Sequence, residues 1–480
     1  MADAQRPNII LIMPDQHRAD ALGCAGNPVV TSPNIDRLAS EGVMFRRAYS
    51  QSPLCQPARA SLLTGRYPHQ HGCLVNRVTF PSPSEPNFLT SLQEAGYHTA
   101  SVGKVHIGVI PPGVDRHEYV SSYGIADLHE VNGKMAHLKM DSAYTDLLSE
   151  AGVLDEFRSD LRSRVAKMAI DEPYAYLTHA EVEGVEQTEP WFAGPAPVPE
   201  ELFIDNYVGD LAVDWLRRYA REESFFFWIG FCGPHDPHDA PASYADPYLE
   251  RWDELPVGSL EPPEPTPSER YNQKLDYFAR YSGTGEMSAD DVRRLRAYYY
   301  GNVSLIDDRI GDILDVLEER GMLDNTWIVF TSDHGDMLGD HQLLAKVVMY
   351  DGALRVPLIV RPPGGIAGLV TDDMVELGDA GATIVDAAGI DPIPSSGARS
   401  LVPYVTGDQG PPRDAVFVEV GDFSGVVTDR HKYIVERETR TPCVLFDRLS
   451  DPDEDDNMAA TDPELEADLM RRYLAPFLAM

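Results

Sequence analysis

The chain has 480 residues, of which 43% are hydrophobic and 24% are charged, so it is long enough and apolar enough to bury a sizeable core. It carries 77 acidic residues against 40 Lys and Arg, and this formal net charge of −37 disfavours binding to nucleic acids and to anionic membranes. The longest apolar run, Phe225 to Cys232, is far shorter than the roughly 18 residues of a membrane-spanning helix, so we expect no membrane span.

The N-terminal segment and the cysteines bear on the cellular compartment. Residues 1–6 are polar and lead directly into an apolar run, without the basic region, long apolar region and cleavage site of a secretion signal. The five cysteines are odd in number and scattered, unlike the framework of a disulfide-rich protein. We therefore expect a cytoplasmic protein with reduced thiols.

Short apolar runs alternate with helical patterns along most of the chain, which predicts an α/β fold. The helix over Pro33 to Ser40 follows Ser32, and a long helix begins after Ser288, where Asp291 completes a capping box. The apolar runs have the length of buried strands: Asn8 to Met13, His98 to Gly103, Ser224 to Phe231, Thr326 to Thr331 and Pro357 to Val360.

The pattern changes from about Asp414 to short β-rich runs followed by one helix. The runs are Ala415 to Val420, Gly425 to Thr428, Tyr433 to Glu436 and Cys443 to Asp447, and the helix covers Pro463 to Leu478. We predict a large catalytic domain over residues 1–405 and a small C-terminal α+β subdomain with an antiparallel sheet over residues 406–480. Residues 232–288, rich in proline and acidic side chains, are predicted to form long surface loops or a lid.

Polar side chains follow four of the predicted strands. Ligands bind α/β sheets at the carboxyl ends of the strands, so these side chains are candidates for a site. They are Asp15 and Gln16; Lys104 and His106; His235 and His238; and Asp333, His334 and Asp336. Each one alone is more often a helix cap, a turn residue or a structural histidine, but four strands direct polar groups to one edge.

A subset of these residues predicts a metal site. Asp15, Asp333 and the amide oxygen of Gln16 are hard oxygen ligands, and His334 directly follows Asp333 in the sequence. We expect one divalent cation, Ca²⁺ first, with Mn²⁺ and Mg²⁺ as alternatives. Asp336, like Asp340, is assigned to capping the next turn.

The segment from Ser52 to Arg66 predicts a helix whose N-terminus lies just after Cys55. Pro57 suits a first helical turn and Gly65 suits a helix end. A helix N-terminus favours negative charge, and Arg59, one turn further on, would add a fixed positive charge. From spacing alone, a second interpretation stays open, in which Cys55 is a small buried hydrophobic residue.

Cys55-x-Pro57-x-Arg59, followed by Ala-Ser-Leu-Leu-Thr-Gly-Arg over residues 60–66, resembles the signature of type I sulfatases in the alkaline phosphatase superfamily. Other segments agree: Pro7-Asn8-Ile9 before Asp15-Gln16, Ser32 to Leu38, Gly103 to His106, Pro234-His235, Ser332 to Gly335, and Lys346 ahead of Tyr350 and Arg355-Val356-Pro357. Together they span most of residues 7–450. The resemblance implies an alkaline-phosphatase-like sandwich, in which helices flank a large, mostly parallel central sheet, with a small C-terminal antiparallel sheet and a helix.

The resemblance also implies a chemistry, the hydrolysis of a sulfate ester. A formylglycine-generating enzyme would convert Cys55 to formylglycine, whose hydrated form attacks sulfur and leaves a covalent sulfate ester. His106 is the implied base that resolves this ester, and His235 would protonate or stabilise the leaving oxygen. With the cation, Arg59, Lys104 and Lys346 would supply the positive charge that the transition state needs. Asn76 would bind a substrate oxygen, with turn capping as the alternative.

The pair Asp15-Gln16 departs from the commonest family pattern, which has two consecutive aspartates. It is similar to choline-sulfatase-like enzymes and to phosphonate monoester hydrolases, a branch in which phosphate diesters and phosphonates are also substrates. Phosphonate monoester hydrolases carry Tyr and Thr where this chain has Lys104 and His106, so we favour sulfate esters. A phosphonate monoester or phosphate diester hydrolase is the alternative, and the complete residue set disfavours a silent binding protein on this scaffold.

The sequence does not specify the leaving group, which could be a small aryl, alkyl or sugar group. Its pocket would be built from loops at residues 110–200 and 235–290, which carry no motif. His69, His71, Trp191 and Tyr207 are candidate lining residues, with packing as the alternative for each. The Pro-rich loops and the C-terminal helix are candidate contacts in a homo-oligomer.

Overall fold

The structure, a computed structural model, describes residues 6–165, 179–181, 183–185, 193–281, 287–394, 396–407 and 412–480. Among these residues, no helix has the length and apolar character needed to cross a membrane. Trp191 lies outside the described residues.

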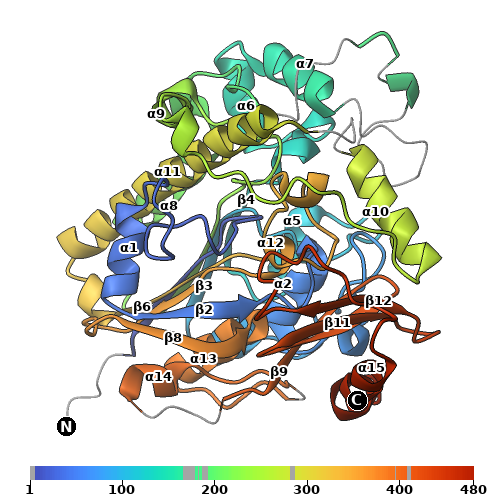
Figure 1. Ribbon diagram of the computed structural model, residues 1–480. Helices are drawn as coiled ribbons and strands as arrows, with labels where there is room; N and C mark the ends of the chain where they lie inside the picture. Colours follow the sequence, from blue (N-terminus) through green and yellow to red (C-terminus); the bar gives the residue numbers. More distant parts are fainter. Residues whose placement is uncertain are drawn as a thin grey trace.

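A large sheet of eight strands forms the centre of the molecule, in the order β4-β3-β5-β1-β6-β7-β2-β8 (Figure 1). Its strands are β1 (Asn8–Ile12), β2 (Val43–Tyr49), β3 (His98–Gly103), β4 (Asp127–Glu130), β5 (Phe225–Gly230), β6 (Thr326–Thr331), β7 (Leu358–Arg361) and β8 (Leu369–Glu376). Neighbouring strands are parallel, except that β7 runs antiparallel to β6 and β2. The predicted α/β fold with a mostly parallel sheet is confirmed.

The sequence patterns did not predict β2, β4 and β8. β4 and β8 are edge strands whose side chains are partly exposed, so they lack a continuous apolar run. β2 is interrupted by Arg46 and Arg47, which reach the surface in the middle of an otherwise buried strand.

Helices cover both faces of this sheet because alternate strand residues point to opposite sides. Ile10 and Ile12 of β1 pack into one apolar core, and Ile9 and Leu11 pack into another. The first core holds α1 (Pro33–Ser40), α6 (Ala143–Glu150), α7 (Leu154–Val165), α8 (Ile204–Arg218) and the long α11 (Ala289–Glu319). The second holds α2 (Cys55–Thr64), α4 (Phe88–Glu94), α5 (Arg116–Ser121), α13 (Leu377–Ala387) and α14 (Val402–Thr406). The result is the three-layer sandwich seen in Figure 1.

A second, antiparallel sheet lies beside the first, in the order β12-β11-β10-β9. Its strands are β9 (Ala415–Val420), β10 (Phe423–Thr428), β11 (His431–Glu436) and β12 (Pro442–Asp447). One face packs on the C-terminal helical segment through Leu469, Leu474 and Phe477, and the other packs on residues 337–354. The predicted C-terminal helix is in fact α15 (Pro463–Leu469), a π-helical turn (Met470–Leu474) and α16 (Ala475–Phe477).

Residues 232–288 are not loop throughout, contrary to part of the prediction. They contain α9 (Ala242–Leu249) and α10 (Glu269–Tyr281). α9 buries Ala245 and Tyr248 in the core that it shares with α11, which is why this proline-rich stretch is ordered as a helix. The remaining helices are short: α3 (Pro68–His71), α12 (Asp351–Leu354), and 3-10 segments at Lys134–Leu138, His179–Glu181, Glu200–Leu202, Trp252–Glu254, Leu323–Asn325 and Asp340–Gln342.

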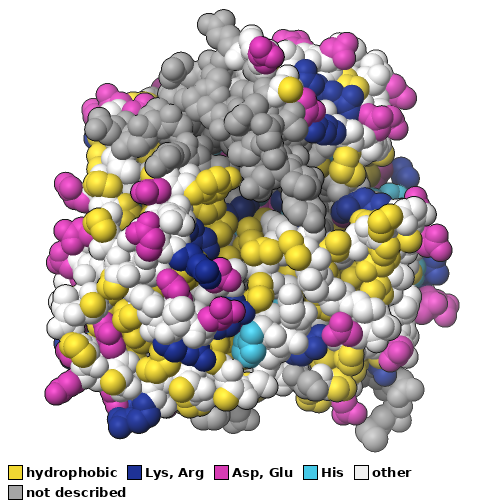
Figure 2. Space-filling view, turned by 90° about the vertical axis from the view of Figure 1, so that its right-hand side faces the viewer, with side chains coloured by type: hydrophobic (Ala, Val, Ile, Leu, Met, Phe, Trp, Pro, Cys, Tyr) yellow, Lys and Arg dark blue, Asp and Glu magenta, His cyan; other side chains and the backbone are white. Residues whose placement is uncertain are grey.

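The parallel strands place five chain segments at one edge of the large sheet. β1, β3, β5 and β6 run in the same direction, so the polar residues that follow them are brought together. β2 leads to the same edge and continues into α2. The expected convergence of the polar segments is confirmed. On one face of the molecule, hydrophobic side chains gather with Lys and Arg near the middle, whereas Asp and Glu lie mostly toward the edges (Figure 2).

Candidate active site

Cys55 is the first residue of α2, whereas the sequence pattern places it just before the helix N-terminus. The helix ends at Gly65, whose φ of 68° is the left-handed conformation that glycine adopts readily, and its N–H donates to Ser61 O. Cys55 is 2% exposed, its Sγ lies 3.1 Å from His334 Nε2, and it lines one cavity together with His106. The sulfur therefore faces polar groups, which excludes the interpretation of Cys55 as a small residue of the apolar core.

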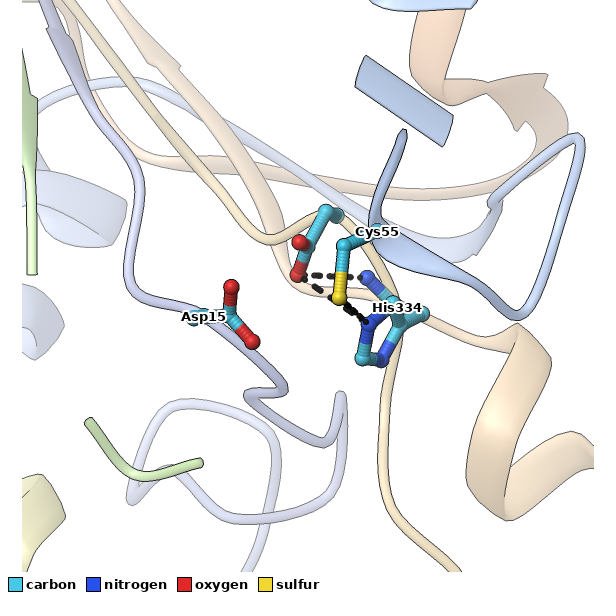
Figure 3. Close-up of side chains that lie close together, drawn as sticks. Asp15, Cys55 and His334 are labelled. Carbon is cyan, nitrogen blue, oxygen red and sulfur yellow. Dashed lines mark hydrogen bonds and ion pairs between the residues drawn. The ribbon is translucent and has the colours of Figure 1, made fainter. Parts of the chain in front are cut away.

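Four of the side chains form a potential metal site. One candidate ligand atom from each of Asp15, Cys55, Asp333 and His334 lies within 4.8 Å of the others. Figure 3 shows the Asp15 carboxylate on one side of this space and Cys55 and His334 on the other. Asp15 Oδ1 is buried without a hydrogen-bond partner, although a buried carboxylate oxygen is normally satisfied. An unsatisfied carboxylate oxygen among further acidic and imidazole ligands fits a divalent cation.

Arg59 and Lys104 hold the two carboxylates in place. The fully buried guanidinium of Arg59 donates to Asp15 Oδ2 at 3.0 Å and to Asp333 Oδ2 at 2.9 Å. Its remaining nitrogen, Nη1, donates to the carbonyl oxygens of Lys104 and Val105. Lys104 Nζ lies 2.6 Å from the same Oδ2 of Asp15. Arg59 thus holds the two carboxylates in place by hydrogen bonds, whereas Lys104 contacts Asp15 and also lines the cavity described below.

The amide of Gln16 is hydrogen-bonded on both sides. Its Oε1 accepts from Lys346 Nζ at 2.5 Å, and its Nε2 donates to Asp236 and Asp336. Gln16 is therefore adjacent to the metal site and connects it to Lys346. Asp336 does cap the following turn, since its Oδ1 accepts from Leu338 N and Ala345 N, as expected. Asp340 forms ion pairs with Arg18 and Arg296.

The electrostatics of the site favour negative charge. Burial alone would raise the pKa of Asp15, but the charges of Lys104 and Lys346 outweigh burial and hold this pKa below its ordinary value. Burial would also raise the pKa of the Cys55 thiol, yet Lys346 and His334 bring it well below its ordinary value. The position of the sulfur is thus one where an anion is stabilised.

Two further histidines line the site. Burial lowers the pKa of His106, so its ring is neutral near pH 7, and its Nδ1 is buried without a hydrogen-bond partner. His235 Nδ1 lies 2.7 Å from the carbonyl oxygen of Asp236, which turns Nε2 towards Asp15, with 3.9 Å between Nε2 and Oδ1. Both rings come from loops that follow strands, as the sequence predicts.

A cavity of about 190 Å³ opens at Cys55. We call it the reaction cavity, and its lining includes Cys55, Asn76, Lys104, His106, His235 and Lys346. Asn76 also accepts a hydrogen bond from Gln56 N at 3.0 Å, which caps the first turn of α2. The structure therefore shows the capping role that was the alternative for Asn76, in a residue that also faces the cavity.

Comparison with known proteins identifies the family. The family model described as sulfatase matches residues 7–390, and the model for the C-terminal region of N-sulphoglucosamine sulphohydrolase matches residues 339–473. The chain belongs to the sulfatase family. This sulfatase is 31% identical over 482 residues to an arylsulfatase of Clostridium perfringens, with 98% of this chain and 94% of the relative covered. It is 30% identical over 469 residues to the choline-sulfatase of Rhizobium meliloti, covering 95% of this chain and 82% of the relative.

The solved structures agree on the fold. The phosphonate monoester hydrolase of Silicibacter pomeroyi superposes with a TM-score of 0.79 at 26% identity, covering 99% of this chain and 94% of the other. Membership of the family makes this protein a sulfuric ester hydrolase. The family uses a divalent metal and a formylglycine, and the unsatisfied Asp15 Oδ1 together with the Asp, Cys and His cluster fits both requirements.

Three of the candidate lining residues of the sulfatase pack elsewhere. His69 Nδ1 lies 2.8 Å from a carboxylate oxygen of Glu419 in the second sheet, and His71 Nε2 bonds to Ser61 Oγ. Tyr207 lies against the ring of Tyr144. None of the three lines the reaction cavity, so for these residues the packing interpretation holds.

The sequence analysis missed several lining residues. Lys134, Asp236, Tyr277 and Phe278 all face the reaction cavity. Lys134 is buried and donates to Asp239 Oδ1 at 2.6 Å, and lysine is rare in this chain, so its rarity is the one signal that could have drawn attention to it. Tyr277 and Phe278 come from α10, in a segment that was interpreted as loop or lid and carries no motif.

Proposed function

We propose that this sulfatase hydrolyses the sulfate ester of a small molecule or sugar, with residue 55 in the formylglycine form made by a formylglycine-generating enzyme. The observation that carries the proposal is the position of Cys55 at the junction of the metal cluster and the reaction cavity, where Lys346, His334 and Lys104 stabilise negative charge. A sulfate group brings negative charge to this point, which matches the potential of the site.

We assign the cation to Asp15, Asp333 and His334, with Gln16 as the fourth ligand. An amide oxygen has two lone pairs, so Gln16 Oε1 can accept from Lys346 and still face an ion. The ligands are mainly oxygens, which favours Ca²⁺ over Mn²⁺ and Mg²⁺ in a site of this kind. When bound, the cation would polarise a sulfate oxygen, and the formylglycine would supply the nucleophilic oxygen.

The remaining side chains bind the sulfate and move protons. Lys104 and Lys346 line the cavity and carry fixed positive charge for the sulfate oxygens. Asn76 faces the same cavity as a candidate partner for a sulfate oxygen. Arg59 has a positioning role, because its guanidinium bonds to Asp15 and Asp333 and to backbone carbonyls.

Two histidines have complementary tasks at the reacting group. His106 is neutral near pH 7 and lines the reaction cavity together with Cys55, so it can accept a proton from the group at position 55. His235 is held by its bond to the Asp236 carbonyl and lines the cavity, so it can donate a proton to the leaving oxygen.

Mass spectrometry of the peptide containing residue 55 tests the proposal. We expect the mass of formylglycine in active enzyme, and activity in proportion to the modified fraction. Protein that carries only an unmodified thiol at residue 55 and is nevertheless fully active would contradict the proposal.

A phosphonate monoester or phosphate diester hydrolase is the second candidate. The Silicibacter pomeroyi phosphonate monoester hydrolase shares the fold over nearly the whole chain. The ratio of kcat/KM for an aryl sulfate to that for an aryl phosphonate monoester separates the two functions. We expect the sulfate to be favoured, and a ratio below one would favour the phosphonate.

A further inference from the structure

A second cavity, of about 350 Å³, adjoins the reaction cavity, and we call it the leaving-group cavity. Both cavities are lined by Lys104, His106, Gly133 and Met135, so they meet beside the group that reacts. At this junction a Cβ on Gly133 would lie 2.9 Å from Lys104 Nζ. Glycine therefore leaves room for the ammonium group where the two cavities join.

Most of the surface that lines the leaving-group cavity is apolar, although eight of the sixteen lining residues have polar or charged side chains. Its apolar side chains are Val109, Ile110, Met135, Ala136, Leu138 and Met140. They come from the loop after β3 and from the segment after β4, two neighbouring strands of the sheet. The volume lies within the range of about 300–1,000 Å³ that is typical of small-molecule sites.

Several polar side chains of the same wall already have hydrogen-bond or ion-pair partners. Both carboxylate oxygens of Glu130 accept from Arg116, at 2.7 and 2.8 Å. The Gln56 amide donates to Gly108 O and accepts from Arg77 N, and Lys139 is paired with Glu181. A hydroxyl-rich leaving group needs partners that can form new hydrogen bonds, and Glu130, Arg116 and Gln56 already use part of their bonding capacity within the protein.

We infer that the preferred substrates are sulfate esters with an apolar ring or chain as the leaving group, bound in the leaving-group cavity. This inference rests on the proposed function, since it concerns the group released from the sulfate. The loop after β3 and the segment after β4 are thus the specificity elements, and Ile110 is a specificity-determining residue on the first of them.

Two primary alkyl sulfates of similar size provide the test. Cyclohexylmethyl sulfate and glucose 6-sulfate both carry a six-membered ring on a CH2–O–sulfate group, and they differ mainly in the ring oxygen and hydroxyls. We expect kcat/KM to be at least about tenfold higher for cyclohexylmethyl sulfate. An equal or higher kcat/KM for glucose 6-sulfate would overturn the inference.

The variant Ile110→Asn places an amide in the apolar wall. We expect it to lower kcat/KM for cyclohexylmethyl sulfate about tenfold and to leave methyl sulfate, which needs only the reaction cavity, within about twofold. The matched control is Val114→Asn, at an exposed position on the same loop and outside both cavities, which leaves both substrates unchanged. An equal loss for both sulfates in Ile110→Asn would overturn the inference.

Inhibition by cyclohexylmethanol separates failure of the inference from failure of the proposed function. We expect the alcohol to compete with methyl sulfate less well in Ile110→Asn than in the wild type. Calorimetric binding of the alcohol gives the same comparison without turnover, and unchanged binding would overturn the inference. Absence of turnover for every sulfate ester, in enzyme with confirmed formylglycine and Ca²⁺, would instead overturn the proposed function.

Discussion

Two groups of buried charges in this sulfatase differ in how they are satisfied. The inter-sheet cluster consists of Asp351, Lys432, Arg448 and Glu454, where the second sheet meets residues 337–354. In it Lys432 pairs with both Asp351 and Glu454, and Arg448 pairs with Asp351. Around Cys55, by contrast, Asp15 Oδ1 has no hydrogen-bond partner, with His235 Nε2 at 3.9 Å from it, and the pKa of a thiol is lowered among cations. Buried charge alone therefore does not mark the site, whereas a buried thiol with a lowered pKa beside a cavity does.

The cysteines show the same difference. Burial raises the pKa of Cys443 to about 12, as expected for a thiol in an apolar environment. Cys55 is also buried, but its charged neighbours reverse the direction of the shift. The two residues are a matched pair for testing which buried thiol reacts.

Replacing Cys55 should have the largest effect on activity. Cys55→Ala removes the proposed nucleophile, and we expect kcat/KM for an aryl sulfate to fall by about 10⁴-fold or more. Cys443→Ala, at a buried cysteine outside the reaction cavity, should keep activity within about twofold, since it acts only on packing. Steady-state assays on both folded variants check this, and an active Cys55→Ala enzyme would remove the distinction between the two cysteines.

The variant Asp15→Asn tests whether the unsatisfied carboxylate of Asp15 binds the proposed cation. We expect a fall of about 10³-fold in kcat/KM, because the variant weakens the cation site that polarises the sulfate. Calorimetry should show Ca²⁺ affinity lowered at least about tenfold. Asp20→Asn is the control, because Asp20 is an exposed partner of Arg18 on the same loop. Unchanged Ca²⁺ affinity in Asp15→Asn would show that the cation lies elsewhere.

Lys432→Met should affect stability and leave catalysis unchanged. Above pH 7, where Glu454 is mostly ionised, removing the fully buried ammonium leaves this carboxylate without its ion-pair partner, and we expect the free energy of unfolding to fall by about 3–5 kcal/mol. Lys139→Met removes an exposed pair with Glu181 and should cost no more than about 1 kcal/mol. Urea unfolding measures both. An equal loss of unfolding free energy in Lys432→Met and Lys139→Met would mean that the inter-sheet cluster does not stabilise the contact between the sheets.

The sequence predicted those parts of the site that depend on local signals. Pro57 and Gly65 mark the ends of α2, and the apolar runs of β1, β3, β5 and β6 place the polar residues after them at one edge. The edge strands β4 and β8 were missed because half-exposed strands do not form continuous apolar runs.

The partners of individual side chains could not be predicted from the sequence, for a different reason. The bond between Gln16 and Lys346 joins residues 330 positions apart, and no local pattern encodes it. The apolar cavity wall after β4 follows a strand that was itself not predicted, so its proximity to His106 became visible only in the fold.

The pH dependence of stability tests the protonation state of Glu454 in the inter-sheet cluster. Burial raises the pKa of Glu454 to about 7, although Lys432 opposes this effect. The folded protein therefore holds this proton more tightly than the unfolded chain, whose glutamate pKa is near 4.5. This tighter proton binding stabilises the folded state, and the stabilisation is fully present below pH 4.5 and is lost as the pH rises to about 7. Ionisation of Glu454 should therefore reduce the free energy of unfolding across this interval.

Glu454→Gln keeps the shape of the side chain and removes the titration. We expect the variant to lose the part of the decline between pH 4.5 and about 7 that Glu454 causes, as measured by urea unfolding at a series of pH values. The effect on kcat/KM should stay within about twofold, because the inter-sheet cluster does not line the reaction cavity. An unchanged pH profile in Glu454→Gln would mean that the pairing with Lys432 keeps Glu454 ionised throughout, and the inter-sheet cluster would then be a fully charged ion pair.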